Sequence, residues 1–130
     1  MSKLQSISSN TVVCINCYRR SGNVGGVSLG DFSISIDSTN SPSDGRAHRT
    51  ELEEFFHIPV KYLFLTHRHP DHRKGISAFK DLTVISSEKT AKLMPKTVKW
   101  DKLNTLTFKD QFILESKDTN LSVAFHHVGG

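Results

Sequence analysis

The sequence predicts an α/β fold, in which helices connect the strands of one sheet. Residues 32–37 alternate apolar and polar side chains, so Phe32, Ile34 and Ile36 should line one face of a core. A helical pattern over residues 42–56 follows, and an apolar strand over residues 60–66 comes next. A short helical pattern over residues 76–79 and a strand over residues 82–86 repeat this order. Strands that alternate with helices are typical of a parallel sheet.

The N-terminal part predicts two strands and a turn. Residues 11–18 have the pattern of a strand, and the glycines between Ser21 and Gly30 predict a turn to the next strand. Cys14 and Cys17 form C-x-x-C inside the first strand. Positions three apart on a strand face opposite sides, and no second pair of metal ligands follows. We therefore expect two free thiols rather than a redox pair or a zinc finger.

The helix over residues 42–56 has a clear start signal. Ser41 is a typical N-cap residue, and Pro42 suits the first helical position because proline has no backbone N–H to satisfy. Leu52, Phe55 and Phe56 follow at helical spacing and predict one buried stripe. Two histidines outside any motif are expected at the surface: His48 and His57.

The C-terminal part predicts one more helix and a group of strands. Residues 87–94 should form a short helix, because a proline follows at position 95. Strands about a turn are expected over residues 108–115, and a last strand over residues 121–128.

The apolar strand over residues 60–66 leads directly into His67, His69, Asp71 and His72. Alternate residues of an extended chain project to one side, so His67 and His69 could share one metal ion. Pro70 biases the preceding residue towards an extended conformation and starts a helical turn, which points Asp71 and His72 in different directions. This arrangement suits a second ion better than a further ligand to the first.

The donor atoms of this cluster favour zinc. Imidazole nitrogen and carboxylate oxygen suit zinc best, and iron and manganese remain alternatives. A solvated histidine-rich loop would be the other explanation, but such a loop has no reason to follow an apolar strand or to alternate so strictly.

The motif His67-x-His69-x-Asp71-His72, with Gly75 after it, resembles the H-x-H-x-D-H signature of the metallo-β-lactamase superfamily. The resemblance implies a dinuclear zinc hydrolase. It assigns His67 and His69 to the first ion and Asp71 and His72 to the second, with Asp71 also orienting the attacking water. It also implies a four-layer αβ/βα sandwich, of which this chain would hold only the N-terminal half. Residues 1–130 would then be a single, truncated domain.

Two further positions gain a role from this resemblance. Asp37 opens a stretch similar to the D-T-G-like turn of the superfamily, although the usual glycine is absent, and would support the metal ligands from behind. Without the resemblance, Asp37 is a turn former at a strand end. The last four residues resemble the approach to the next motif of the superfamily, whose histidine would come directly after Gly130. In a shifted register, His127 would be a substitute ligand.

Composition sets the remaining bounds. The 130 residues suit one domain, with 36% hydrophobic and 23% charged residues. No apolar run is long enough for a membrane span, and the first residues lack a secretory apolar core, so we expect a cytoplasmic protein without a membrane partner. The net charge is +4, but lysine and arginine are scattered along the sequence. We therefore read them as a solvated surface and do not expect nucleic acid as a partner.

The function expected from the sequence is metal-dependent hydrolysis of a small-molecule substrate whose identity the residues do not reveal. One alternative is a metal-binding fragment or assembly module without catalytic activity, because part of the superfamily's ligand set lies outside this chain. Another is the nuclease branch of the superfamily, which only the isoelectric point of about 9.2 favours. An exposed half-sandwich surface would also allow a homodimer.

Overall fold

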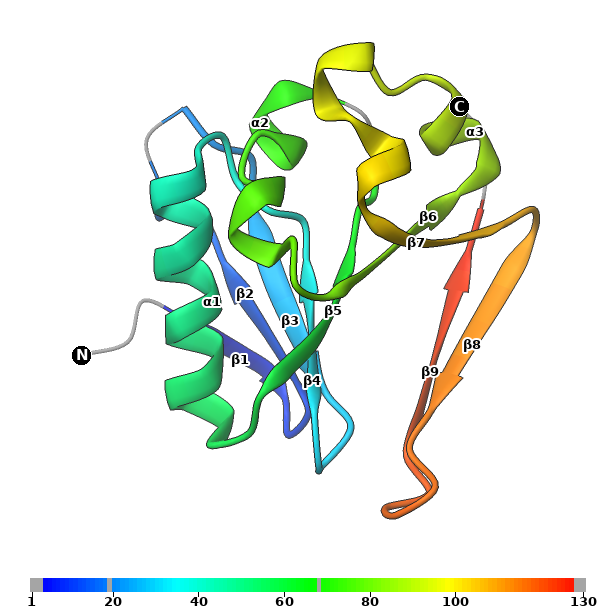
Figure 1. The fold of residues 1–130 in the computed structure, drawn as a ribbon. Coiled ribbons are helices and arrows are strands. Elements are labelled where there is room, and N and C mark those ends of the chain that lie inside the picture. Colours follow the sequence, from blue (N-terminus) through cyan, green and yellow to red (C-terminus); the bar gives the residue numbers. More distant parts are fainter. Residues whose placement is uncertain (1–3, 19, 68, 128–130) are drawn as a thin grey trace.

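The computed structural model describes residues 4–18, 20–67 and 69–127. These residues form a seven-stranded sheet, whose strands are ordered as in the sequence, and a separate two-stranded ribbon (Figure 1). The sheet contains β1 (Gln5–Ser8), β2 (Thr11–Cys14), β3 (Val24–Ser28), β4 (Ser33–Ile36), β5 (Val60–Phe64), β6 (Thr83–Ser87) and β7 (Asn104–Phe108). The ribbon contains β8 (Gln111–Glu115) and β9 (Ser122–His126).

The sheet changes from antiparallel to parallel at β4. Strands β1 to β4 pair antiparallel, and β4 to β7 pair parallel. The parallel strands are joined by α1 (Pro42–Phe56), by α2 (Pro70–Arg73) with η1 (Ile76–Phe79), and by α3 (Glu88–Lys92) with η2 (Lys96–Val98) and η3 (Trp100–Lys102). Right-handed crossovers that all step in one direction place their helices on one face of the sheet. The predicted α/β fold is therefore confirmed.

Each face of the sheet has its own core. On the helix face, Leu52 of α1 and Phe79 of η1 pack with Leu63 of β5. On the other face, the β8–β9 ribbon contributes Phe125, which stacks on Phe64 of β5 with ring centroids 4.0 Å apart. Figure 1 shows α1 and the ribbon on opposite sides of the sheet. Strand β5 is thus covered on both faces, as its apolar sequence predicts.

Several local predictions are confirmed. Helix α1 begins at Pro42, and the Ser41 hydroxyl accepts a hydrogen bond of 3.1 Å from the Asp44 N–H. Phe32 and Ile34 lie in the second core, as the alternation along β4 predicts. No helix of the described residues is long and apolar enough to cross a membrane.

The prediction that Phe55 is buried is wrong, as is the surface position expected for His48. Phe55 is 38% exposed, because it lies in the last turn of α1 and contacts Phe56 edge-on instead of the sheet. The buried stripe runs along Gly45, His48 and Leu52. His48 lies one helical turn before Leu52, so the same face of α1 buries both side chains.

The glycine-rich stretch is a strand rather than a turn. Gly25 and Gly26 lie within β3, directly under α1. A Cβ at Gly26 would collide with the Leu52 side chain, and the Gly25 carbonyl oxygen lies 2.9 Å from Nε2 of His48. The missing side chain of Gly26 lets α1 pack against the backbone of β3, which a pattern of apolar residues cannot reveal.

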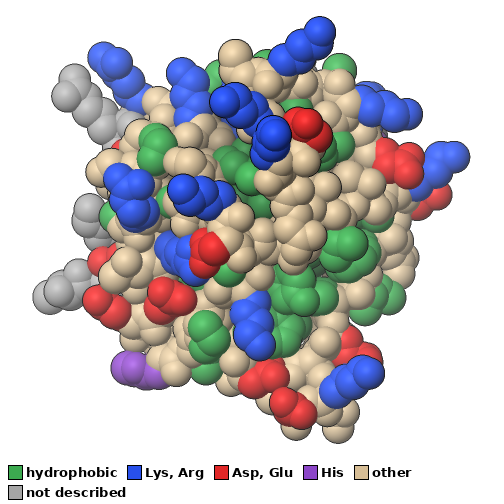
Figure 2. All heavy atoms as spheres, viewed as in Figure 1, with side chains coloured by type: hydrophobic (Ala, Val, Ile, Leu, Met, Phe, Trp, Pro, Cys, Tyr) green, Lys and Arg blue, Asp and Glu red, His purple; other side chains and the backbone are tan. Residues whose placement is uncertain are grey.

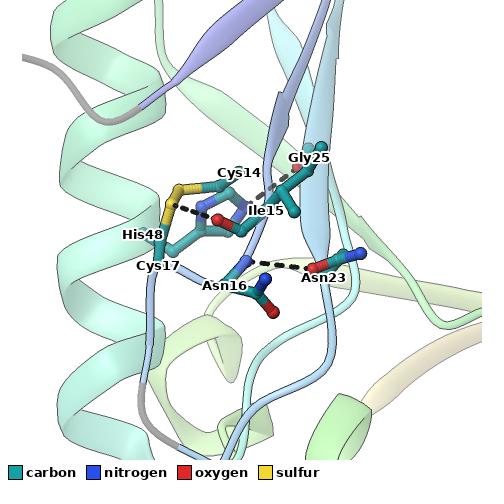
Figure 3. Close-up of a disulfide and its surroundings, with 7 residues drawn as sticks. All are labelled: Cys14, Ile15, Asn16, Cys17, Asn23, Gly25 and His48. Carbon is teal, nitrogen blue, oxygen red and sulfur yellow. Dashed lines mark hydrogen bonds between the residues drawn. A yellow bond between two sulfur atoms is a disulfide. The ribbon is translucent and has the colours of Figure 1, made fainter.

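The prediction of free thiols is also wrong, because Cys14 and Cys17 form a disulfide (Figure 3). Strand β2 ends at Cys14, and Asn16 adopts a left-handed backbone conformation with φ 55°. The Asn16 N–H donates a hydrogen bond of 3.0 Å to the Asn23 side chain. This turn brings the two Cα atoms to 5.7 Å, so the argument from opposite strand faces does not apply.

We expect His48 to make the folded state less stable in acid. Burial lowers the pKa of His48 from 6.5 to about 4, so the unfolded chain takes up a proton that the folded chain excludes. The contribution is fully present above pH 6.5 and is lost as the pH falls towards 4, by about 3 kcal/mol. Denaturant unfolding as a function of pH measures this slope.

His48→Gln should flatten that slope, because glutamine can still donate to the Gly25 carbonyl but does not titrate. His57→Gln is the matched control, since His57 is exposed at the end of the same helix. An unchanged slope in His48→Gln would contradict the buried, neutral histidine.

Candidate metal centre

The histidine motif lies at the carboxyl end of β5. The Leu65 N–H donates to the Ile85 carbonyl of β6 at 2.9 Å, and the Thr66 N–H then turns to the Asp37 carboxylate at 2.8 Å. Parallel pairing places β5 between β4 and β6, whose carboxyl ends meet at the same edge. This edge is where α/β sheets usually hold their sites.

The four-residue helix α2 carries Asp71 and His72 and is held in place by its neighbours. The Asp71 carbonyl accepts hydrogen bonds from the Gly22 N–H at 3.1 Å and the Ser21 hydroxyl at 3.3 Å. The His72 carbonyl accepts two more, both 2.9 Å, from the N–H and hydroxyl of Ser38. A single turn has little stability of its own, so these contacts fix where the two side chains point.

The structure brings the four motif side chains together. The ring centroid of His67 lies 4.8 Å from that of His69 and 4.0 Å from that of His72. The Asp71 carboxylate approaches Nε2 of His72 to 3.6 Å. The four motif side chains thus lie next to one another at the end of β5, and two of them, His67 and His72, have ligand atoms within 4.8 Å of each other.

Asp37 lies behind this cluster and is only 3% exposed. Its backbone is left-handed, with φ 67°, a conformation that aspartate tolerates better than most residues. Its carboxylate accepts from the Thr66 N–H at 2.8 Å, the Thr66 hydroxyl at 2.7 Å and Nδ1 of His72 at 2.7 Å. These three bonds compensate for burying the charge.

The same hydrogen bonds fix which nitrogen each ring presents. A carboxylate only accepts, so Nδ1 of His72 carries the proton and leaves the lone pair of Nε2 free. The Thr66 hydroxyl donates its proton to Asp37, so its oxygen accepts from Nδ1 of His67 at 2.8 Å. His67 therefore also presents Nε2. Sequence analysis missed Thr66, and the only signal was its place directly before the first histidine.

The surroundings shift the pKa of His67 and the pKa of His72 in opposite directions. Burial, reinforced by the nearby His72, lowers the pKa of His67 and favours the neutral imidazole that binds metals. The hydrogen bond to Asp37 raises the pKa of His72. A metal ion would then compete with a proton for Nε2 of His72.

The residues fit a divalent metal ion. The group whose ligand atoms all lie within 4.8 Å of one another is Asp37, His67 and His72. The oxygens of Asp37 already accept three hydrogen bonds. Among the described residues, neither His69 nor Asp71 belongs to this group. Gly22 faces His72, and a Cβ there would collide with Nε2. The glycine keeps the space beside this nitrogen open.

His127 lies apart from this arrangement. It follows β9, and its N–H donates to the Asp110 carbonyl beside β8 at 2.9 Å. No described contact joins its ring to those of the motif, so its role as a substitute ligand stays a prediction.

Comparisons with protein families, curated proteins and solved structures gave matches among the solved structures alone. No protein-family profile matches the sequence. No curated protein matches it either. Among solved structures, the chain is similar to a metallo-β-lactamase from Pontibacter korlensis, with a TM-score of 0.69, 19% identity and coverage of 97% of this chain. It is also similar to the metallo-β-lactamase FIM-1 from Pseudomonas aeruginosa in its mono-zinc form, with a TM-score of 0.60, 14% identity and coverage of 88%.

A third similar structure is a B3 metallo-β-lactamase with an active-site glutamic acid, with a TM-score of 0.66, 16% identity and coverage of 88% of this chain. The chain has the metallo-β-lactamase fold. It spans 67% of the length of the Pontibacter enzyme and about half of the other two, at 51% and 48%. The metallo-β-lactamase fold resemblance drawn from the motif is therefore confirmed.

Asp37→Asn should lower the pKa of His72 in metal-free protein, because the hydrogen bond to Asp37 is the main cause of its rise. The raised pKa stabilises the folded state below pH 6.5, and this contribution is lost as the pH rises through the folded value. Asparagine also turns an N–H towards existing donors, which should reduce stability by about 1–3 kcal/mol. NMR titration and thermal unfolding in a chelator measure both effects.

Asp71→Asn is the matched control, since Asp71 is the smallest contributor to the His72 shift. Equal shifts in the two variants would show that Asp37 does not hold the ring.

Proposed function

We propose that this chain belongs to a metal-dependent hydrolase with a dinuclear zinc site. His67 and His69 would hold one ion, and Asp71 and His72 the other. The observation that carries this proposal is the convergence of three imidazole rings and one carboxylate, two of the rings with Nε2 left free by hydrogen bonds to Thr66 and Asp37. A solvated histidine loop has no need of a buried carboxylate behind it.

When bound, divalent ions would supply Lewis acidity and lower the pKa of a nearby water. The chain's own residues do the rest. The Asp71 side chain is 44% exposed, so water can reach its carboxylate and donate a hydrogen bond to it. Asp71 then holds and orients the water for attack and can accept its proton. Asp37 and Thr66 keep the rings of His72 and His67 in place throughout.

The substrate class follows from this chemistry. A positioned water attacks a carbonyl or phosphoryl centre, so small-molecule lactams, lactones, thioesters and phosphodiesters are the candidates. The residues that follow His72 resemble small-molecule hydrolases more than the RNA-processing branch.

A second candidate is a metal-binding module without catalytic activity. The partial coverage of the solved neighbours favours it, because ligands from the remainder of the fold would lie outside this chain. Exposed apolar side chains such as Ile7, 67% exposed, and Ile113, 55% exposed, support a homodimer or a covering segment on this half of the fold. Zinc binding without turnover would favour the silent module.

Calorimetry should detect zinc binding to this chain with modest affinity, because an incomplete ligand set gives up part of the binding free energy. His67→Ala and His69→Ala should each weaken it by more than about tenfold, since each removes one of few ligands. His57→Ala is the control and should leave the affinity unchanged. Tight binding that survives both motif substitutions would overturn the site assignment.

Asp71→Asn should reduce any zinc-dependent turnover, in this chain or a longer protein that contains it, by about 100-fold or more. The amide keeps the shape of the side chain but cannot take up a proton. A panel of lactam, lactone, thioester and phosphodiester substrates measures the rate. Asp101→Asn, on the exposed η3 turn, is the control. Equal rates in Asp71→Asn and the parent would remove Asp71 from the mechanism.

A further inference from the structure

A pocket of about 480 Å³ lies between the segment that follows His72 and the η2–η3 segment. None of the four motif residues lines it, and neither does Asp37. Five cationic side chains do: Arg73, Lys74, Lys80, Lys99 and Lys102. The pocket is therefore a feature of its own, next to the candidate metal centre but not part of it.

The fold gathers charges that the sequence keeps apart. The lysines and arginines are scattered along the sequence, but five of them line this pocket, where the four lysines remain exposed to solvent. Crossovers from β5 to β6 and from β6 to β7 lie on the same face, so residues 73–80 meet residues 97–103. Figure 2 shows basic side chains gathered over the upper part of this view, where Figure 1 places α2 and the helical turns before β7.

Asp81 and Asp101 lie close to pocket lysines in the sequence, but neither lines the pocket. No carboxylate lines it, and none of its four lysines forms an ion pair within the described part of the chain. Asp81, beside Lys80, is engaged by Arg49 through hydrogen bonds of 2.7 and 2.9 Å. Like charges around a concave surface raise the positive potential and concentrate anions there.

The backbone at Lys99 is held in an uncommon conformation. Lys99 is left-handed, with φ 55° and ψ 51°, at the junction of η2 and η3. Its N–H donates to the Lys96 carbonyl at 3.1 Å, and its carbonyl accepts from the Lys102 N–H at 2.9 Å. Glycine or asparagine would adopt this conformation with less strain. A lysine at this position strains the backbone, but it lines the pocket with a cation.

The rest of the lining defines the ligand chemistry. Ile76, Val98 and Leu103 give the pocket apolar surface between the cations. A volume of about 480 Å³ is in the range of small-molecule sites. Phosphate groups suit a cluster of lysines and an arginine, and an apolar surface suits a flat organic body.

We propose that this pocket binds an organic phosphate of nucleotide size, with its phosphates on the cationic rim and its organic body on Ile76, Val98 and Leu103. Binding does not require a metal ion, so the proposal stands or falls separately from the hydrolase.

The test is calorimetric titration of the chain with ADP, in the presence of a chelator, at low and at moderate salt. ADP should bind, and its affinity should fall as salt screens the rim. Adenosine and inorganic pyrophosphate should each bind at least about tenfold more weakly, because each lacks one half of the recognised chemistry.

Two lysine pairs separate the pocket from general surface charge. Lys99→Gly with Lys102→Gln should weaken ADP binding by about tenfold or more, since each change removes a cation from the rim. Lys109→Gln with Lys117→Gln removes the same charge from exposed turns beside β8 and should leave the affinity unchanged. Glycine relieves the left-handed backbone at position 99, so the thermal midpoint should not fall for that reason. Lys102→Gln alone, with a smaller loss, serves if the pair does not fold.

Each contrary result has a definite meaning. Equal loss in both lysine pairs, or none in the pocket pair, overturns the proposal. If adenosine binds as tightly as ADP, the pocket has no phosphate site. If pyrophosphate binds as tightly as ADP, the pocket has no site for the organic body. If a single-stranded oligonucleotide binds and ADP does not, the surface is a nucleic-acid site and the proposal of a small-molecule pocket is wrong.

Discussion

The buried carboxylate of Asp37 joins the ends of β4 and β5, and the candidate metal centre depends on it. Its three hydrogen bonds run to the Thr66 backbone, the Thr66 hydroxyl and the His72 ring, which are the points where the chain leaves β5 and enters α2. A buried charge without these donors would be strongly unfavourable, so the Asp37 carboxylate can be buried because it accepts these hydrogen bonds. The tautomers of His67 and His72 follow from this one carboxylate, although neither ring needs a metal ion to be held.

The features that could be predicted from the sequence are those that depend on a few neighbouring residues. The N-cap at Ser41 fixes the start of α1, and the alternation along β4 fixes its core face, because each depends on a few neighbouring residues. The metal motif was also readable, since its four side chains lie within six positions of one another. Asp37 was assigned a supporting role only through resemblance to a family. Its left-handed backbone and its bond to Thr66 come from strands that meet in space.

The errors have a common physical origin in contacts between distant segments. His48 was expected at the surface, but α1 packs on β3, and the Gly25 carbonyl accepts a hydrogen bond from its ring. Gly26, one of the glycines that suggested a turn, lets α1 approach the sheet. The cysteine pair was judged on a strand that in fact ends at Cys14. The cationic pocket could not be anticipated either, because its members span residues 73–102 and meet only through two crossovers.

The turn that carries Asp71 and His72 is the least self-sufficient part of the site, and its support extends back to the disulfide. Four residues cannot sustain a helix, so α2 relies on Ser38 on one side and on Ser21 and Gly22 on the other. The second support begins a few residues after the Cys14–Cys17 link and is anchored at Asn23 by the Asn16 N–H. Gly22 also lies against the His72 ring. The geometry of the candidate metal centre therefore rests on two loops outside the motif, and changes in the β2–β3 connection should reach His72 without altering any ligand.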